Sequence, residues 1–296
     1  MTWREAMHAA LYGPGGFYAR GEPPARHFRT SVHVSPSYAA AIWELLRQVD
    51  AGLGHPGRID LVDIGAGRGE LLEQVLAAAE QGTAAEQGTA AEQGTAAESG
   101  GAGAGGAPWA DSAPGAGRAS RAGGVSGASV ASGLAGRIAA CAVEVAPRPA
   151  GLDPRIGWQP VPPAGITGLV IASEWLDNVP LDVVELTAAG PAVVQVDPAT
   201  GAERPGCPPD PADLAWTRAW WPLVAHGDRA EVGRARCEAW AGVIRRIDRG
   251  VAVAVDYGHV KAARPAWGTL TGYLEGRAVA PLPDGSRDIK IGRAHV

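Results

Sequence analysis

The stretch that decides the fold is Arg58-Ile-Asp-Leu-Val-Asp-Ile-Gly-Ala-Gly-Arg-Gly-Glu-Leu-Leu-Glu-Gln-Val-Leu76. It opens with a short apolar run, residues 59–64, of the kind that forms a strand buried on both faces of a parallel sheet. Three closely spaced glycines follow, which let the backbone turn sharply and let a ligand approach it. Apolar residues then recur at helical spacing. The stretch predicts a strand, a glycine loop that presents backbone N–H groups to a ligand, and a helix.

The spacing of the loop narrows the choice of ligand. The dinucleotide fingerprint is G-x-G-x-x-G, whereas here the third glycine comes one residue early and an acidic residue, Asp63, stands two residues before the first. This pattern resembles motif I of the class I S-adenosylmethionine-dependent methyltransferases. The resemblance implies that Asp63 faces the ammonium group of the cofactor, and that the loop packs against its methionine part. The loop residues are Gly65, Ala66, Gly67 and Gly69. A structural glycine turn in another α/β protein is the alternative.

Composition excludes several classes of protein. The chain has 296 residues, of which 46% are hydrophobic, enough to bury a core. Its net charge is -5, without a basic cluster, so we expect no nucleic-acid partner. Three widely spaced cysteines suggest neither a zinc site nor a disulfide framework, so no metal is expected. No apolar run is long enough to span a membrane and no signal peptide opens the chain. We therefore expect a cytoplasmic protein with no membrane partner.

The N-terminal region, residues 1–57, is expected to form a helical cap. Its motifs are Ala-Leu-Tyr12, Gly-Phe-Tyr18 and Phe28-Arg-Thr-Ser, and a Ser-Pro pair that begins a second helix. Together with the strand and the Gly-Ala-Gly-Arg-Gly loop they resemble the MidA family, methyltransferase-fold proteins that include mitochondrial arginine methyltransferases of respiratory complex I assembly. The resemblance implies that Thr30 and Ser31 contact the cofactor. The family's usual Gly-Asp-Phe and Pro-Glu-Ile around this pair are absent here.

A second acidic residue follows a second strand. Residues 78–136 are dominated by Ala, Gly, Ser and a repeated Ala-Ala-Glu-Gln-Gly-Thr unit, which cannot bury enough apolar surface to fold, so we predict a disordered insert. Order returns with a strand over residues 137–145 that carries Glu144 near its end. Acidic residues at such strand ends bind ribose hydroxyls. By resemblance Glu144 is the ribose ligand, and a solvent-exposed glutamate is the alternative.

Two carboxylates follow the next apolar strand, residues 168–172. The segment Ser173-Glu-Trp-Leu-Asp-Asn-Val-Pro180 resembles the family motif Asn-Glu-Phe-x-Asp-Ala-x-Pro, with Ser173 in place of the usual Asn. Glu174 and Asp177 are the candidate catalytic residues, because carboxylates can pair with a guanidinium and orient it. The alternative is structural: Glu174 caps a turn or a helix.

The remaining chain supplies further elements. Two short strands are expected over residues 183–186 and 192–196, a helix over 231–247, and a strand over 251–255 that ends in Asp256-Tyr-Gly. The last six residues, Ile-Gly-Arg-Ala-His-Val296, resemble a translated sequencing adapter. We therefore expect residues 290–296 to be a non-native tail and the fold to be C-terminally incomplete.

These observations predict an α/β protein with a doubly wound, Rossmann-like class I methyltransferase sheet and an N-terminal helical cap, its domain spanning residues 58–289. By resemblance it uses S-adenosyl-L-methionine to methylate an arginine of a protein substrate, which could be a respiratory-complex subunit. Two other classes stay open: a non-catalytic assembly or scaffold protein that kept the fold, and a nucleotide-dependent oxidoreductase.

Overall fold

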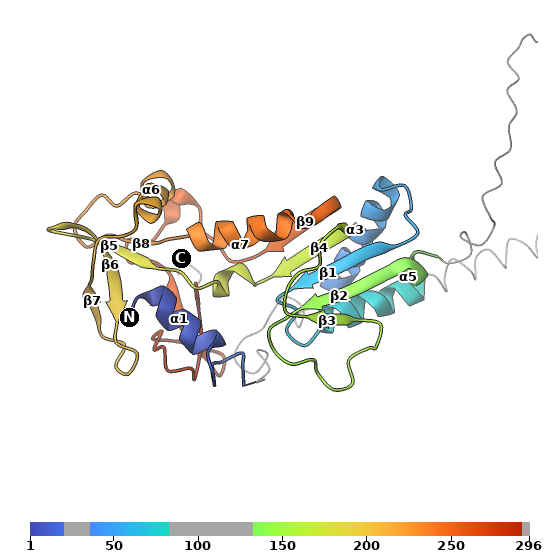
Figure 1. The fold of residues 1–296 in the computed structure, drawn as a ribbon, viewed down its shortest axis with the longest axis horizontal. Helices are drawn as coiled ribbons and strands as arrows, with labels where there is room; N and C mark the ends of the chain where they lie inside the picture. Colours follow the sequence, from blue (N-terminus) through green and yellow to red (C-terminus); the bar gives the residue numbers. More distant parts are fainter. Residues whose placement is uncertain (21–35, 83–132, 292–296) are drawn as a thin grey trace, which may run out of the picture.

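A parallel five-stranded sheet forms the centre of the computed structural model, which describes residues 1–20, 36–82 and 133–291. Its order is β3-β2-β1-β4-β9 (Figure 1). The strands are β1 (Ile59–Ile64), β2 (Ile138–Val143), β3 (Gly157–Gln159), β4 (Ile166–Ser173) and β9 (Ile247–Val255). Because β2 lies on one side of β1 and β4 on the other, the order reverses between β1 and β4. Doubly wound sheets bind ligands at the carboxyl ends of the strands at such a switch point.

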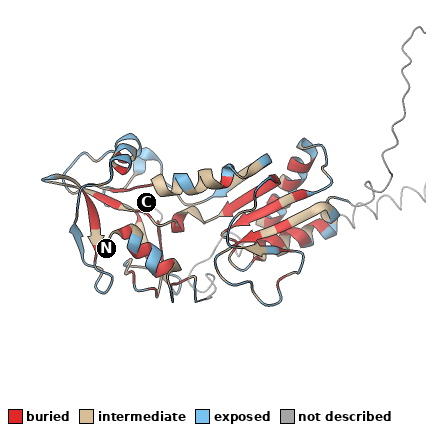
Figure 2. Ribbon diagram, in the orientation of Figure 1, coloured by how far each residue is buried: buried red, intermediate tan, exposed pale blue. Residues whose placement is uncertain are grey.

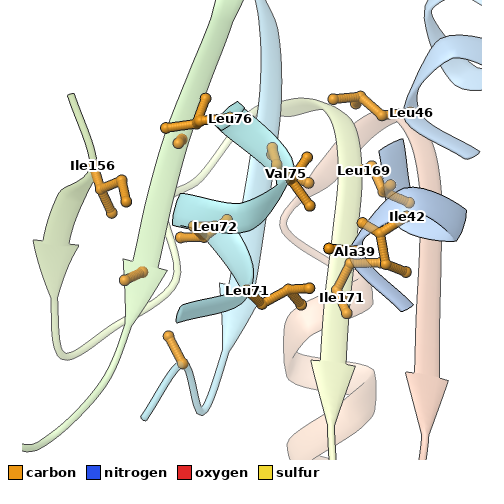
Figure 3. Packing of buried hydrophobic residues seen from close by; sticks show 14 of the residues in the cluster. Ala39, Ile42, Leu46, Leu71, Leu72, Val75, Leu76, Ile156, Leu169 and Ile171 are labelled. Atoms are coloured by element: carbon orange, nitrogen blue, oxygen red, sulfur yellow. The ribbon is translucent and has the colours of Figure 1, made fainter. Parts of the chain in front are cut away.

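Helices cover both faces of this sheet, as the buried apolar strand predicts. On one face, Leu61 and Ile171 pack against α3 (Pro36–Gly52) and the helix that spans residues 70–82 (Figure 3). On the other face, Val62 packs with α7 (Arg234–Ile244). Alternate residues of a strand point to opposite faces of the sheet, so each strand contributes side chains to the hydrophobic cores on both faces. The prediction of an α/β fold with a parallel sheet is confirmed.

A second part of the molecule lies beyond the carboxyl end of β4 (Figure 1). The two short strands expected over residues 183–186 and 192–196 are present and pair within an antiparallel sheet of order β7-β6-β5-β8. These strands are β5 (Val183–Thr187), β6 (Gly190–Val196), β7 (Glu203–Pro205) and β8 (Arg229–Glu231). A three-stranded sheet consists of β10 (Leu270–Leu274), β11 (Arg277–Val279) and β12 (Asp288–Ile291). The short helices are α5 (Leu134–Arg137), α6 (Pro211–Trp220), η2 (Leu176–Asn178) and η3 (Lys261–Ala263).

The first helix, α1 (Trp3–Tyr12), belongs to this second part. A capping box starts it, with the Thr2 hydroxyl accepting from the Glu5 N–H and the Glu5 carboxylate accepting from the Thr2 N–H. Its buried face, including Trp3, packs against β5, β6 and β12. The helices within residues 1–57 therefore contribute to two cores, because α1 packs in this core and α3 packs on the parallel sheet. Figure 2 shows buried residues on the strands of both parts.

Two expected boundaries differ from the structure. The predicted helix over residues 231–247 is shorter, because Glu231 ends β8, where its carboxylate accepts from the Thr269 hydroxyl at 2.9 Å, and Ile247 already begins β9. The helix of residues 70–82 extends into the predicted insert, and α5 lies at the other end of the insert. Arg137, the last residue of α5, donates from Nη1 to Asp50 Oδ1 at 2.7 Å. The rest of that insert, 83–132, lies outside the described residues. Within the described ranges, no helix is both long and apolar enough to cross a membrane.

Candidate functional site

The glycine loop follows β1 at the switch point, and its backbone conformation explains its composition. Gly65, Gly67 and Gly69 have φ angles of 71°, 60° and 85°, which residues with a Cβ rarely adopt. The Gly65 N–H donates to the Val143 carbonyl at 2.9 Å, and the Gly69 N–H donates to the Ala66 carbonyl at 2.8 Å. The structure therefore brings the four predicted loop residues together in one tight turn at the end of the sheet.

The three glycines differ in the space that surrounds them. This difference shows which glycines are required by packing and which one leaves space for a ligand. A Cβ on Gly65 would lie 2.8 Å from Trp175 Cδ1, and a Cβ on Gly69 would lie 2.8 Å from Leu152 Cδ1. A Cβ on Gly67 would have its nearest neighbour 3.9 Å away. Gly65 and Gly69 are thus required by packing as well as by conformation. Gly67 is the loop position at which a ligand can approach the backbone.

Asp63 lies on β1, two residues before the loop, with 3% of its surface exposed. Burial is the main reason why its pKa is raised to about 8, and the neighbouring carboxylates of Glu144 and Glu70 raise it further. A cation placed against such a carboxyl favours its ionised form. Asp63 therefore fits the ammonium group that the motif I resemblance implies.

Glu144 follows β2 directly and reaches the glycine loop. Its carboxylate accepts the N–H of Gly67 at 3.0 Å and, from its own turn, the N–H groups of Val145 at 2.7 Å and Ala146 at 3.1 Å. Two carboxylate oxygens at the end of the second strand suit the paired hydroxyls of a ribose. Glu144 thus lies beside Asp63 and Gly67, and its role as the ribose ligand stays a prediction.

The turn after β4, residues 173–178, carries the two predicted catalytic carboxylates. Glu174 has a φ of 52°, a left-handed conformation that is strained for a residue with a side chain. Its side chain is half-buried, whereas Asp177, in η2, is 1% exposed. Burial raises the pKa of Asp177 well above its usual value. The two acids follow one strand end, but Glu174 is the more accessible.

Asp177 belongs to a buried polar network that the sequence analysis missed. Its Oδ2 atom and the Asp288 Oδ2 atom each lie 3.4 Å from the Lys290 ammonium. Asp288 also accepts from Asn178 Nδ2 at 2.8 Å and from the Tyr18 hydroxyl at 2.9 Å. These residues come from η2, β12 and the segment after α1, and no local spacing links them. Lys290 falls in the tail predicted to be non-native, and that origin stays a prediction.

A tyrosine from α3 also reaches this turn. The Tyr38 hydroxyl and the Ser173 hydroxyl share a hydrogen bond of 2.6 Å. Burial is the main reason why the pKa of Tyr38 is raised, and the carboxylates of Asp63 and Glu174 add to it. Tyr38 is not among the site residues that the sequence predicted. Thr30 and Ser31, the other predicted cofactor contacts, lie outside the described residues.

Taken together, the strand ends present the open backbone at Gly67, a buried carboxyl for a cation and a carboxylate for ribose hydroxyls on one side. On the other side they present Glu174. The N–H groups of residues 65–69, which the sequence predicted for a ligand, all donate within the chain. This set of groups fits a cationic nucleoside such as S-adenosyl-L-methionine, with room at Gly67 for it to approach the loop. Among the described residues, no group of three or more His, Cys, Asp or Glu side chains could hold a metal ion.

Comparison with a family model agrees with this arrangement. The model described as "Putative S-adenosyl-L-methionine-dependent methyltransferase" matches residues 139–291, from β2 to β12. The matched segment includes Glu144, Glu174 and Asp177. It excludes the glycine loop, so the match does not depend on the loop's Gly-x-Gly-x-Gly pattern. A search of curated proteins found no match.

Two solved structures share the fold. One is a "likely methyl transferase" from Burkholderia thailandensis bound to S-adenosyl-homocysteine, with a TM-score of 0.67 and 20% identity over 99% of this chain and 68% of that chain. The other is an uncharacterized protein of the same superfamily and organism, with a TM-score of 0.66 and 21% identity over 99% of this chain and 67% of that one. At these identities the likeness shows the fold.

Proposed function

The chain belongs to the family of S-adenosyl-L-methionine-dependent methyltransferases, and from this premise we propose that it methylates a guanidinium nitrogen of a protein arginine, as the MidA-like motifs imply. The cofactor supplies the methyl group when bound. Asp63 would hold its ammonium group, Glu144 its ribose hydroxyls, and the loop from Gly65 to Gly69 its methionine part. Ala66 contributes backbone to this loop. Thr30 and Ser31 are proposed as further contacts on the strength of the resemblance alone.

The single observation that carries the proposal is the position of Glu174. It directly follows β4 at the switch point, and the next residue, Trp175, lies against Gly65 of the glycine loop. A carboxylate here would stand beside the bound cofactor and could accept the forked N–H groups of a guanidinium. Such pairing would orient one nitrogen and stabilise its positive charge as the methyl group is transferred.

Asp177 would act behind Glu174. It is buried and already paired with Lys290, so it would support the turn that carries Glu174 through the Asp177–Lys290–Asp288 group and would not contact the acceptor. A respiratory-complex subunit is the acceptor that the family resemblance suggests. The match to methyltransferases does not favour the oxidoreductase alternative.

The experiment is a calorimetric titration of the chain with S-adenosyl-L-methionine, beside a Gly67→Val variant. The valine side chain would project into the open space at Gly67 and should reduce affinity at least about 100-fold, because it occupies the approach to the backbone. The matched control is Gly276→Val, at a glycine that also has positive φ, 77°, and open space around a Cβ, in the turn between β10 and β11. Equal affinity of wild type and Gly67→Val would contradict the site.

Methyl transfer is then tested with cofactor tritiated on its methyl group and acetyl-Gly-Arg-Gly amide as acceptor, followed by hydrolysis and amino-acid analysis. Labelled methylarginine that disappears in Glu174→Gln would support the proposal. Cofactor binding without transfer to this peptide or to arginine-containing proteins of a cell extract would instead favour the non-catalytic assembly protein.

A further inference from the structure

The turn after β4, residues 173–178, is hydrogen-bonded to the end of β9. Asp256, the residue that directly follows β9, has no part in the function proposed above. β9 is the neighbour of β4, with Ser173 paired to Val255. The Val255 carbonyl accepts the Glu174 N–H at 2.8 Å. One residue on, Asp256 Oδ2 accepts the Leu176 N–H at 2.7 Å, so the turn is bound to β9 at two of its N–H groups.

The second oxygen of the same carboxylate fixes Asp256 itself. Asp256 Oδ1 accepts the N–H of Tyr257 at 2.8 Å. With one oxygen on its own chain and one on the β4 turn, the side chain is a rigid bridge between the two strand ends. Charge-assisted bonds of this kind are about twice as strong as neutral ones.

Between the two bound N–H groups, the chain bends at Glu174, which has a left-handed φ of 52°. The next residue, Trp175, lies against Gly65, where a Cβ on the glycine would lie 2.8 Å from the indole. The strained residue therefore stands between the glycine loop and β9, and strain of this kind persists only where surrounding contacts enforce it.

We propose that Asp256 is a positioning residue that enforces the left-handed conformation of Glu174 and thereby holds its carboxylate beside the cofactor loop. Asp256 touches neither cofactor nor acceptor in this role and acts through the Leu176 N–H. The inference rests on the proposed function only for the use made of Glu174; the strain itself can be measured without any substrate.

The first test compares Glu174→Gly with Glu174→Ala in two backgrounds. Glycine accepts a positive φ and alanine does not, so Glu174→Gly should melt about 2–4 °C above Glu174→Ala. In the Asp256→Ala background the turn can relax, and the difference should fall below about 1 °C. Asp256→Asn keeps one acceptor oxygen for the Leu176 N–H. In this background at least half of the melting-temperature difference between Glu174→Gly and Glu174→Ala should return. Asp256→Ser replaces Asp256→Ala should the alanine variant not fold.

The second test asks whether the turn's position matters for transfer. With wild-type Glu174, Asp256→Ala should lower turnover of acetyl-Gly-Arg-Gly amide at least tenfold, keep S-adenosyl-homocysteine affinity within twofold, and be rescued by Asp256→Asn. If Glu174→Gly and Glu174→Ala differ in melting temperature as much in the Asp256→Ala background as in the wild-type background, the inference is overturned, whatever the activity. If wild type proves inactive, the melting comparison still decides the role of Asp256, and only the proposed function is lost.

Discussion

The proposed cofactor-binding side of the candidate site and its proposed acceptor-binding side, the turn with Glu174 and Asp177, are built by different means. The cofactor side is one continuous stretch, residues 63–69, joined by Glu144, and its geometry follows from backbone conformation at three glycines. The acceptor side couples η2 to β12 and the N-terminal segment through buried charges. The geometry of the glycine loop therefore depends on residues that are neighbours in the sequence. The buried charge network forms only when segments that are distant in the sequence pack together.

The largest effect should come from removing the cation of the acceptor side. Lys290→Met leaves the carboxyls of Asp177 and Asp288 buried without it, which should cost about 3–5 kcal/mol of unfolding free energy near neutral pH. Burial already raises both pKa values. The folded state therefore binds the extra protons, and the cost should shrink as the pH falls and the carboxyls become neutral.

Urea unfolding at several pH values measures this effect. The matched variant is Lys290→Met combined with Asp177→Asn, which removes one buried charge together with the cation and should recover part of the stability. Lys290→Met could instead lower the unfolding free energy by less than about 1 kcal/mol, equally at every pH. The network would then contribute no more than a surface ion pair, and the difference drawn between the two sides would be wrong.

On the cofactor side, the three glycines should differ in cost. Gly65→Ala and Gly69→Ala combine a positive φ with a Cβ contact of 2.8 Å to a neighbouring side chain, so each should lose about 2–3 kcal/mol. Gly67→Ala has the positive φ without the contact and should lose about 1 kcal/mol. Urea unfolding of the three variants ranks them. Equal losses would show that conformation alone, and not packing on Trp175 and Leu152, sets the requirement.

Asp63 should make cofactor binding depend on pH. Its pKa of about 8 means that the free carboxyl is mostly protonated near neutral pH, so binding of an ammonium group should release close to one proton. Affinity should rise up to about tenfold per pH unit below that pKa and level off above it. Calorimetry in buffers of different ionisation enthalpy measures the released proton, and Asp63→Asn is the control that should release none.

The same shift has a consequence for the free protein. Because the folded pKa of Asp63 lies above the unfolded value of about 3.9, its proton is held more tightly in the folded state. Stability should therefore fall as the pH rises from about 4 to about 8 and be constant beyond, as far as this residue is concerned. Asp63→Asn should remove this part of the pH dependence.

The smallest effect is expected at the contact between the two sides. Tyr38→Phe removes the 2.6 Å hydrogen bond to Ser173 and should cost about 1 kcal/mol. Combined with Ser173→Ala, the loss should be less than the sum of the single losses, because both variants break the same bond. Strict additivity in thermal or urea unfolding would show that the two hydroxyls make separate contributions.

Much of the parallel sheet could be predicted from the chain, because its strands are short apolar runs and its loop is a run of glycines. The positions of Asp63 in β1 and of Glu144 directly after β2 could be predicted, because the local pattern defines a strand end. Asp288 and Tyr18 could not be found, because their hydrogen bond joins positions 270 residues apart. The helix over 231–247 was overextended since the burial of Glu231 in β8 depends on Thr269, which lies far along the chain.

The sequence by itself determined the order of strand, glycine loop and helix, the apolar faces of the central strands and the acidic residues at their ends. Hydrophobic periodicity and glycine conformation are local properties, so they can be read from neighbouring residues. Only the tertiary structure decided that Glu174 adopts a left-handed conformation between Gly65 and Asp256, and that Asp177 is buried against Lys290. Both depend on contacts between strands and segments that are remote in the chain, where burial and charge act through space.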